Sequence, residues 1–262
     1  MYPHHKEAIE AITNKLKNRE GTAGIIIGGS VAHGYADETS DIDIIIVLTD
    51  EHYAKAQAAN DLGYFETESC SYEGGYVDGK VVSVDYIKNV AKSGNEPSKF
   101  AFKDAFVTFS RVEGLEQLVA EASNYPVDKK EENMTKFYAQ FETWKWYYYE
   151  GLKRNNKLLI DYCLTNYAFF AGRLILAYNE TLFPSYKWFN RVLEEVSHKP
   201  DRFVQMVDDV VELKSPEAVE RLYEAVIPFH NWYTQGHHWT VQFMLDSQMN
   251  WTDGRAVPIL DI

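Results

Sequence analysis

Two short apolar runs, residues 24–28 and 42–48, frame the most constraining stretch of this sequence. The first run is Gly-Ile-Ile-Ile-Gly, β-branched and closed by glycines, and the second has the length and composition of a buried strand. Between them, Ser30–Tyr35 has room for one or two helical turns, and a polar loop follows at residues 37–40. The sequence therefore predicts two strands of one sheet, joined by a short helical turn and a loop.

The glycine pair that ends the first run predicts a turn able to hold an anion. Gly28-Gly29-Ser30 combines two residues without a Cβ, which permit close backbone approach, with a hydroxyl donor at the start of a helical segment. No Gly-Lys-Ser/Thr follows, so this is not a Walker A loop. We expect Gly29, Ser30 and the hydroxyl of Ser40 to contact phosphate oxygens, although a plain strand-to-helix turn is the alternative.

Two aspartates stand at the head of the second run, as Asp41-Ile42-Asp43. Residues two apart in a strand project to the same face, so the two carboxylates would point together while Ile42 enters the core. Two like charges held together are costly without a cation, and Mg²⁺ prefers carboxylate and phosphate oxygens. Taken singly, an aspartate here is better explained as a strand-entry or turn residue than as a metal ligand. Taken together, Asp41 and Asp43 are expected to be catalytic and to hold metal on a triphosphate.

Asp85 is the acid of another apolar run, residues 81–87, which predicts a strand beside residues 42–48. If the two strands pair, three carboxylates converge near the glycine turn. Such a set holds two cations roughly 3.5–4 Å apart and supports in-line displacement at phosphorus. Asp85 would then bind the second metal ion or accept the proton of the attacking hydroxyl. A solvated edge residue is the alternative.

The remaining patterns predict two domains of different kinds. The first, residues 1–126, contains the sheet and ends where Asn124-Tyr125-Pro126 breaks the pattern. The second, residues 127–262, is all helical, with a looser tail at 257–262. The fold class is thus α+β: a small mixed-sheet domain followed by a helical bundle. Further elements of the first domain are expected at 5–19 (helix), 51–59 (helix), 64–78 (hairpin or loop), 106–111 (strand) and 114–122 (helix), and helices of the second at 129–155, 157–179, 185–197, 201–213 and 216–235.

Charge and composition limit the classes of molecule that this chain is expected to bind. The 26 Lys and Arg against 39 Asp and Glu give a formal net charge of -13. An extended nucleic acid is therefore a poor candidate, whereas a small or cationic acceptor is easier to accommodate. Cys70 and Cys163 stand alone, without the spacing of a disulfide framework or a zinc site. Residues 158–178 are interrupted by Asp161, Asn166 and Arg173, which favours a buried amphipathic helix over a membrane span. The first residues lack the apolar stretch of a signal peptide, so we expect a cytoplasmic protein.

The residues Gly29-Ser30, Ser40-Asp41-Ile42-Asp43 and Asp85 resemble the motif of the DNA polymerase beta-like nucleotidyltransferase superfamily. That motif is Gly-Ser, a short spacer, Asp-x-Asp and a third acid on a later strand. The two-part layout is similar to that of the antibiotic adenylyltransferases that modify aminoglycosides or lincosamides. The resemblance is strong over residues 24–48 and thin in the helical half. It implies that ATP donates AMP to an acceptor hydroxyl and that pyrophosphate leaves.

The same resemblance suggests further nucleotide contacts. A lysine of the helical half contacts the phosphates in similar enzymes, which makes Lys187 the candidate here, with Tyr186 beside it. His33 occupies a position after Gly-Ser where relatives often carry a polar residue. The alternatives are a surface lysine and a packing histidine.

Three functions fit these features. The first is AMP transfer to a small-molecule hydroxyl bound by the helical half, where Glu142 and Glu150 are either acceptors of ammonium groups or ordinary solvated glutamates. The second is AMP transfer to a protein. The third is an inactive sensor of nucleotides, which retention of both Asp41 and Asp43 disfavours. The sequence does not decide the acceptor or the oligomeric state.

Overall fold

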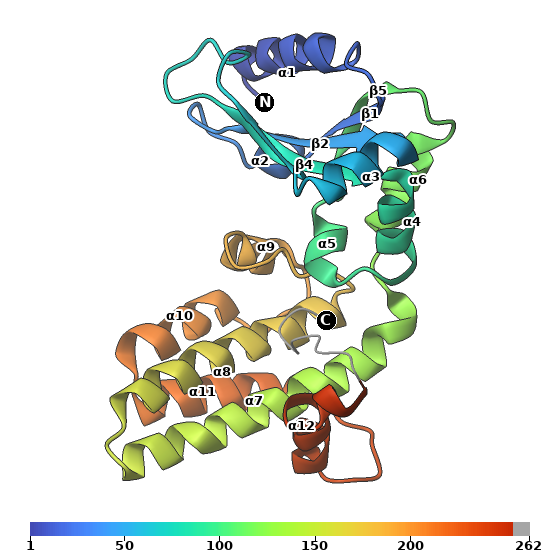
Figure 1. Ribbon diagram of the computed structural model, residues 1–262. Helices are drawn as coiled ribbons and strands as arrows, with labels where there is room; N and C mark the ends of the chain where they lie inside the picture. Colours follow the sequence, from blue (N-terminus) through green and yellow to red (C-terminus); the bar gives the residue numbers. More distant parts are fainter. Residues whose placement is uncertain (254–262) are drawn as a thin grey trace. The chain divides into compact units, whose positions relative to one another are not determined.

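The computed structural model describes residues 1–253 and divides the chain into two compact units, Met1–Asn124 and Tyr125–Ile262 (Figure 1). The division lies two residues from the domain boundary predicted at residue 126. A mixed sheet with helices makes up the first unit and helices make up the described part of the second, so the predicted α+β class is confirmed. The tail predicted at 257–262 lies outside the described residues.

The sheet of the first unit has five strands in the order β3-β4-β2-β1-β5. β2 and β4 run parallel, and the other neighbouring strands pair antiparallel. This parallel pair matters for the site, because residues near the starts of both strands meet at one end of the sheet. The strands are β1 (Thr22–Ile27), β2 (Ile42–Leu48), β3 (Gly63–Glu66), β4 (Val77–Ser83) and β5 (Phe106–Ser110).

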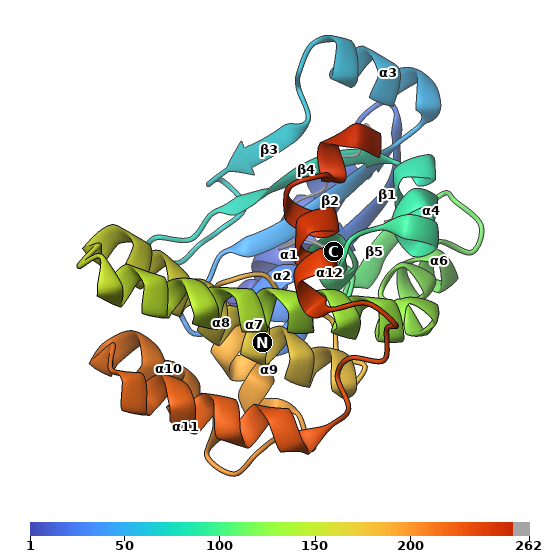
Figure 2. The ribbon, with the colours of Figure 1, turned by 90° about the horizontal axis from the view of Figure 1, so that it is seen from below.

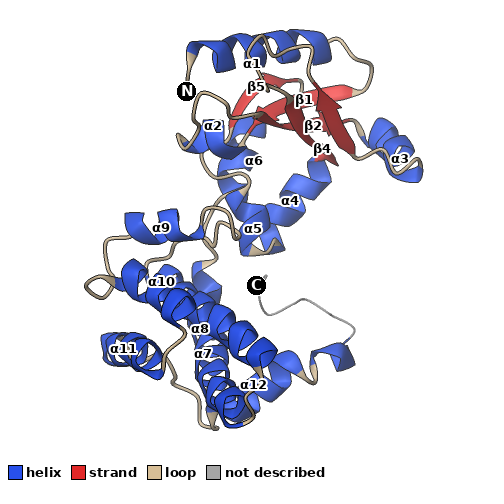
Figure 3. Cartoon of the chain, turned by 90° about the vertical axis from the view of Figure 1, so that its left-hand side faces the viewer, coloured by secondary structure: helices blue, strands red, loops and turns tan. Residues whose placement is uncertain are grey.

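Each face of the central strands buries its own core, as alternation in a strand requires. Ile44 and Ile46 of β2 pack with α1, whereas Ile45 and Val47 pack with α4 and α6. Figure 3 shows the sheet lying between α1 and the pair α4 and α6. Full burial of each such side chain contributes roughly 1.5–3 kcal/mol. The helices of this unit are α1 (Pro3–Leu16), α2 (Gly29–His33), α3 (Asp50–Ala58), α4 (Val84–Ser93), α5 (Glu96–Phe100) and α6 (Leu115–Ala122).

A pair of long helices, α7 and α8, forms the centre of the second unit, and the two lie side by side in Figure 2. Most of α8 beyond Tyr162 is buried, because its sequence is apolar on nearly every side. Within residues 1–253, no helix has the length and apolar character needed to cross a bilayer. The helices are α7 (Lys130–Lys153), α8 (Lys157–Tyr178), α9 (Phe189–Glu195), α10 (Phe203–Leu213), α11 (Pro216–Val226) and α12 (Trp239–Ser247), with 3₁₀ turns at Val127–Lys129, Ile227–Phe229 and Asn250–Asp253.

The strand predicted at residues 81–87 is wrong. The strand begins earlier, at Val77, and ends at Ser83, whose hydroxyl accepts a hydrogen bond from Tyr86 N at 3.0 Å. That contact caps the helix α4, so the β-branched residues after Ser83 continue as helix. The sequence reading also missed α5 and α12, and it extended the helices predicted at 185–197 and 216–235 beyond the bounds of α9 and α11.

Candidate active site

Three aspartates, Asp41, Asp43 and Asp78, converge at one end of the sheet. Each offers a carboxylate oxygen, and these oxygens all lie within 4.8 Å of one another. The parallel register explains the convergence, because Asp43 of β2 lies directly opposite Asp78 of β4, while Asp41 immediately precedes β2. All three side chains are partly buried. Three like charges at this spacing repel one another strongly in the folded chain.

Gly29 lies against this group and has no room for a side chain. Its φ is +59°, and a Cβ built on it would fall 1.6 Å from Asp43 Oδ2. The turn is held to the strand by Gly28 N, which donates to the carbonyl oxygen of Asp43 at 3.0 Å. A glycine is therefore required here, because only glycine combines this backbone conformation with so close an approach.

Ser30 carries a buried hydroxyl beside the aspartates. Its side chain is 5% exposed, and its Oγ has no hydrogen-bond partner among the described residues. A buried hydroxyl without a partner costs about 1–3 kcal/mol. The position after Gly29, next to the carboxylates, suits a donor to an oxygen of a bound ligand.

The hydroxyl of Ser40 is engaged within its own loop. Its Oγ accepts from Asp37 N at 2.9 Å and lies 3.2 Å from Asp37 Oδ1, and its carbonyl accepts from the Tyr72 hydroxyl at 2.8 Å. Hydrogen bonds from Thr39 and Ser40 lower the pKa of Asp37. Ser40 thus fixes the loop that leads into Asp41, and its predicted contact with phosphate stays a prediction.

His33 lies at the end of α2, with a nearly buried side chain. Its Nδ1 is 3.3 Å from Asp104 Oδ2, and its ring lies 4.6 Å from the Phe100 ring centroid. These contacts favour the packing alternative, and a contact with the triphosphate stays a prediction.

Asp85 lies far along the sheet from the other predicted acids. In the parallel register Ser83, the last residue of β4, is opposite Leu48, the last residue of β2. Asp85 follows in the first turn of α4, exposed and paired with Lys88 at 3.0 Å. The prediction that Asp85 converges with Asp41 and Asp43 is therefore wrong, and Asp78 holds that place.

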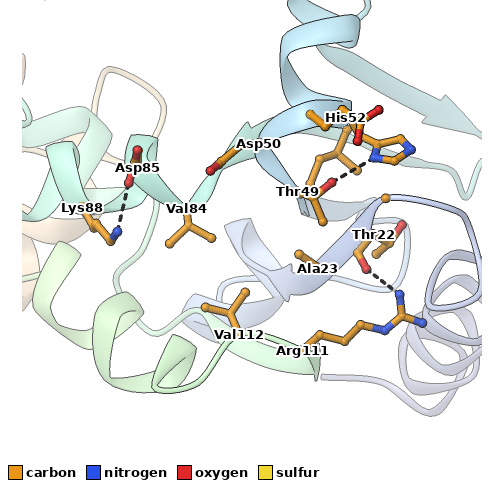
Figure 4. Close-up of a pocket in the computed structure, with 13 residues that line it drawn as sticks. Thr22, Ala23, Thr49, Asp50, His52, Val84, Asp85, Lys88, Arg111 and Val112 are labelled. Atoms are coloured by element: carbon orange, nitrogen blue, oxygen red, sulfur yellow. Dashed lines mark hydrogen bonds and ion pairs between the residues drawn. The ribbon is translucent and has the colours of Figure 1, made fainter.

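Figure 4 shows the surroundings of Asp85, a hollow of about 640 Å³ at this far end of the sheet. His52 and Arg111 also line it, with His52 Nδ1 at 2.9 Å from Thr49 Oγ1 and Arg111 donating to the Thr22 carbonyl at 3.1 Å. Acidic and basic side chains are mixed around this hollow, and among the described residues its acids do not converge as Asp41, Asp43 and Asp78 do.

Tyr76 and Lys80, each two residues from Asp78 in the chain, have shifted pKa values. The carboxylate of Asp41 is the main cause that raises the pKa of the Tyr76 hydroxyl. Burial lowers the pKa of Lys80, while the charge of Asp43 opposes that shift. The sequence reading missed Asp78 and Lys80, although the alternation Val-Asp-Gly-Lys-Val over residues 77–81 is typical of a half-buried strand.

Tyr186 and Lys187 belong to the second unit, just before α9. Both are exposed; the Tyr186 ring stacks on Phe169 at 5.2 Å, and Lys187 Nζ lies 5.0 Å from the centroid of the Trp188 ring. Their contact with a nucleotide stays a prediction.

The donor set at Asp41, Asp43 and Asp78 fits a hard divalent cation. Carboxylate oxygens are what Mg²⁺ and similar ions bind, and their spacing allows one ion to contact several of them. The mutual repulsion of the three charges, which a cation would remove, is the physical reason to expect one there.

Known proteins provide a further comparison. Residues 9–143, just over half of the chain, match the family model of the nucleotidyltransferase domain. Among solved structures, a nucleotidyltransferase-like protein from Exiguobacterium sibiricum is 11% identical, with a TM-score of 0.44, and the alignment covers 97% of this chain and 81% of that one. Spectinomycin adenyltransferase AAD(9) from Enterococcus faecialis, solved with ATP and spectinomycin, is 13% identical, with a TM-score of 0.30 and coverages of 92% and 94%. A search of curated proteins gives no match.

Proposed function

This chain belongs to the nucleotidyltransferase domain family, and we propose that it transfers AMP from ATP to a hydroxyl of a small-molecule acceptor, with release of pyrophosphate. The observation that carries this proposal is the convergence of Asp41, Asp43 and Asp78 beside the Gly29-Ser30 turn. Family membership supports nucleotidyl transfer in general. The choice of ATP follows from the resemblance of the two-part layout, a sheet unit followed by a helical unit, to antibiotic adenylyltransferases.

Each residue of the site has a role in this proposal. Asp41, Asp43 and Asp78 would hold Mg²⁺, which when bound neutralises charge on phosphate oxygens. Ser30 Oγ would donate to a phosphate oxygen and so satisfy its buried hydroxyl. Gly29 lets the backbone lie close enough to Asp43 for both groups to face the same ligand.

The proposed reaction is an in-line displacement at the α-phosphorus. The acceptor's hydroxyl oxygen forms a bond to that phosphorus, and the bond from phosphorus to the oxygen that bridges to the β-phosphate breaks. The electron pair of the broken bond leaves with pyrophosphate, and the hydroxyl proton passes to a carboxylate of the site or to water.

A small acceptor is proposed from the layout and charge of the chain. The order of the chain, a sheet unit followed by a helical unit, resembles that of antibiotic adenylyltransferases, and the net charge of -13 favours a cationic compound. An aminoglycoside- or lincosamide-like molecule is therefore the class to test first.

Pyrophosphate release tests the proposal directly. Wild-type protein with ATP and Mg²⁺ is screened against aminoglycosides, lincosamides and plain sugars, and Asp43→Asn is assayed with the acceptor that responds. We expect the variant to lose at least about 100-fold in rate, since removal of one group that stabilises transition-state charge costs that much. Circular dichroism checks that the variant is folded.

Two outcomes would contradict the proposal. If folded Asp43→Asn releases pyrophosphate as fast as the wild type, the aspartates are not catalytic. With ATP labelled in its α-phosphate, label appearing on a protein band instead of in small products would identify the acceptor as a protein.

A further inference from the structure

Lys80 lies on the same face of β4 as Asp78, because residues two apart along a strand share a face. In the parallel register it is opposite Ile45 of β2, just as Asp78 is opposite Asp43. Its side chain therefore starts from the sheet face that carries the carboxylates, one pleat farther from the sheet end.

The stem of Lys80 is half-buried against the segment that adjoins the glycine turn. Its Nζ lies 5.9 Å from the centroid of the Phe102 ring, which is 1% exposed. The neighbouring residue Ala101 has its carbonyl oxygen 3.2 Å from the point where a Cβ on Gly28 would lie. Lys80 thus shares a strand face with Asp78, and its ammonium contacts the segment whose Ala101 carbonyl lies against Gly28.

Apart from the Phe102 ring, the ammonium of Lys80 has no partner among the described residues. Across residues 1–253 its Nζ makes no hydrogen bond or ion pair, and Asp43 is the charged group whose field acts on it. A lysine that served only to offset Asp43 would be expected within ion-pair distance of that carboxylate. A half-buried ammonium with no hydrogen-bond acceptor is unfavourable, and an anion brought to the site would relieve that cost.

We propose that Lys80 is a phosphate-binding residue, whose Nζ donates a charge-assisted hydrogen bond to an oxygen of the triphosphate held at Asp41, Asp43 and Asp78. This inference rests on the proposed function, because it requires a triphosphate at the three aspartates. A lysine ammonium, a compact charge with three donors, suits a triphosphate. The same contact would stabilise negative charge on pyrophosphate as it leaves.

Binding measurements with inorganic tripolyphosphate test the role without relying on turnover. Calorimetry in the presence of Mg²⁺ compares wild type with Lys80→Met, which keeps the length but removes the charge, and with Lys80→Arg, which keeps the charge. Lys92→Met, an exposed lysine of α4, is the matched control. Binding of Mn²⁺ alone, followed by electron paramagnetic resonance, reports on the aspartates separately.

We expect Lys80→Met to bind tripolyphosphate at least about tenfold more weakly, as loss of a hydrogen bond to a charged group predicts. Lys80→Arg should retain most of the affinity, Lys92→Met all of it, and Mn²⁺ should bind Lys80→Met as tightly as wild type or more tightly. Equal tripolyphosphate binding by wild type and folded Lys80→Met would overturn the inference alone. A wild-type protein that binds no tripolyphosphate would overturn the proposed function, and this inference with it.

Discussion

Two groups of acidic side chains, one in each unit, are arranged in opposite ways. In the helical unit, acids and hydroxyls satisfy one another: Tyr138 and Tyr223 both donate to Glu142 Oε1, at 2.6 and 2.9 Å. Glu220 likewise accepts from Tyr149 at 2.5 Å and Lys145 at 2.7 Å. These carboxylates are hydrogen-bonded within the fold, and the bonds from one helix to the other stabilise the packing of α7 against α11.

In the sheet unit, three carboxylates of like charge gather at one end of the sheet. Three carboxylates lie within 4.8 Å, and the buried Ser30 hydroxyl beside them has no partner in the described chain. Like charges held this close repel one another, and a buried hydroxyl without a partner is costly; a bound cation and a bound phosphate oxygen would offset these two costs. We therefore assign ligand binding to the carboxylates of the sheet unit and a stabilising role to the hydrogen-bonded glutamates of the helical unit. For Glu142 this favours a structural role over binding of an ammonium group.

The largest expected effect comes from exchanging the third acid. Asp78→Asn should reduce pyrophosphate release by at least about 100-fold, because it removes one of the three converging charges. Asp85→Asn, at the far end of the sheet, should stay within about twofold of wild type, since an exposed ion pair such as that of Asp85 with Lys88 contributes little. Initial rates at saturating ATP measure both. A large loss of rate in Asp85→Asn with little loss in Asp78→Asn would identify Asp85 as the third catalytic acid and contradict the site described at Asp41, Asp43 and Asp78.

A smaller effect on rate, together with a loss of stability, is expected from Gly29→Ala. The new Cβ would overlap Asp43, so the carboxylate or the turn must move, and the positive φ adds about 1–2 kcal/mol of strain. Gly34→Ala is the matched control, because Gly34 has a φ of +74° but nothing within 4 Å of its added Cβ. Both variants should unfold at lower temperature, whereas only Gly29→Ala should lose activity. Equal activity in the two would remove the glycine turn from the site.

Local patterns in the sequence were sufficient for much of the fold. The bounds of β2, residues 42–48, match the prediction, and α7 and α8 differ from it by one or two residues, because long apolar periodicity leaves few alternatives. The strand at 81–87 was misread since Val84 and its β-branched neighbours suit a strand, whereas the Ser83 cap starts a helix. The hydrogen bond from Tyr86 N to the Ser83 hydroxyl caps α4, and this local contact outweighs the strand propensity of the β-branched residues.

Some residues of the site can be predicted from local sequence spacing, whereas others depend on which strands pair. Asp41 and Asp43 were found because their two-residue spacing is a local property of a strand. Asp78 was missed because its place depends on the pairing register of β2 with β4, which joins residues far apart in the chain. The same register moves Asp85 to the opposite end of the sheet.

The smallest effect is expected in the helical unit, from Glu220→Gln. Burial raises the pKa of Glu220, but hydrogen bonds from Lys145 and Tyr149 outweigh it, so the folded pKa lies below the usual 4.5. A pKa lowered by folding means that the ionised carboxylate adds stability, fully present above pH 4.5 and lost as pH falls through the folded value. Because the side chain is 42% exposed, water screens the pair and the contribution is below about 1 kcal/mol.

Thermal unfolding from pH 7 down to pH 3 measures this contribution. Glu220→Gln should unfold at a slightly lower temperature than wild type at pH 7, and the gap should close below about pH 4.5, where the wild-type carboxylate also becomes neutral. Glu224→Gln, an exposed position of the same helix α11, should show little gap at any pH. Pyrophosphate release per folded molecule should be unchanged in both variants. A loss of release in Glu220→Gln without a loss of stability would place chemistry in the helical unit and break the division between the two units.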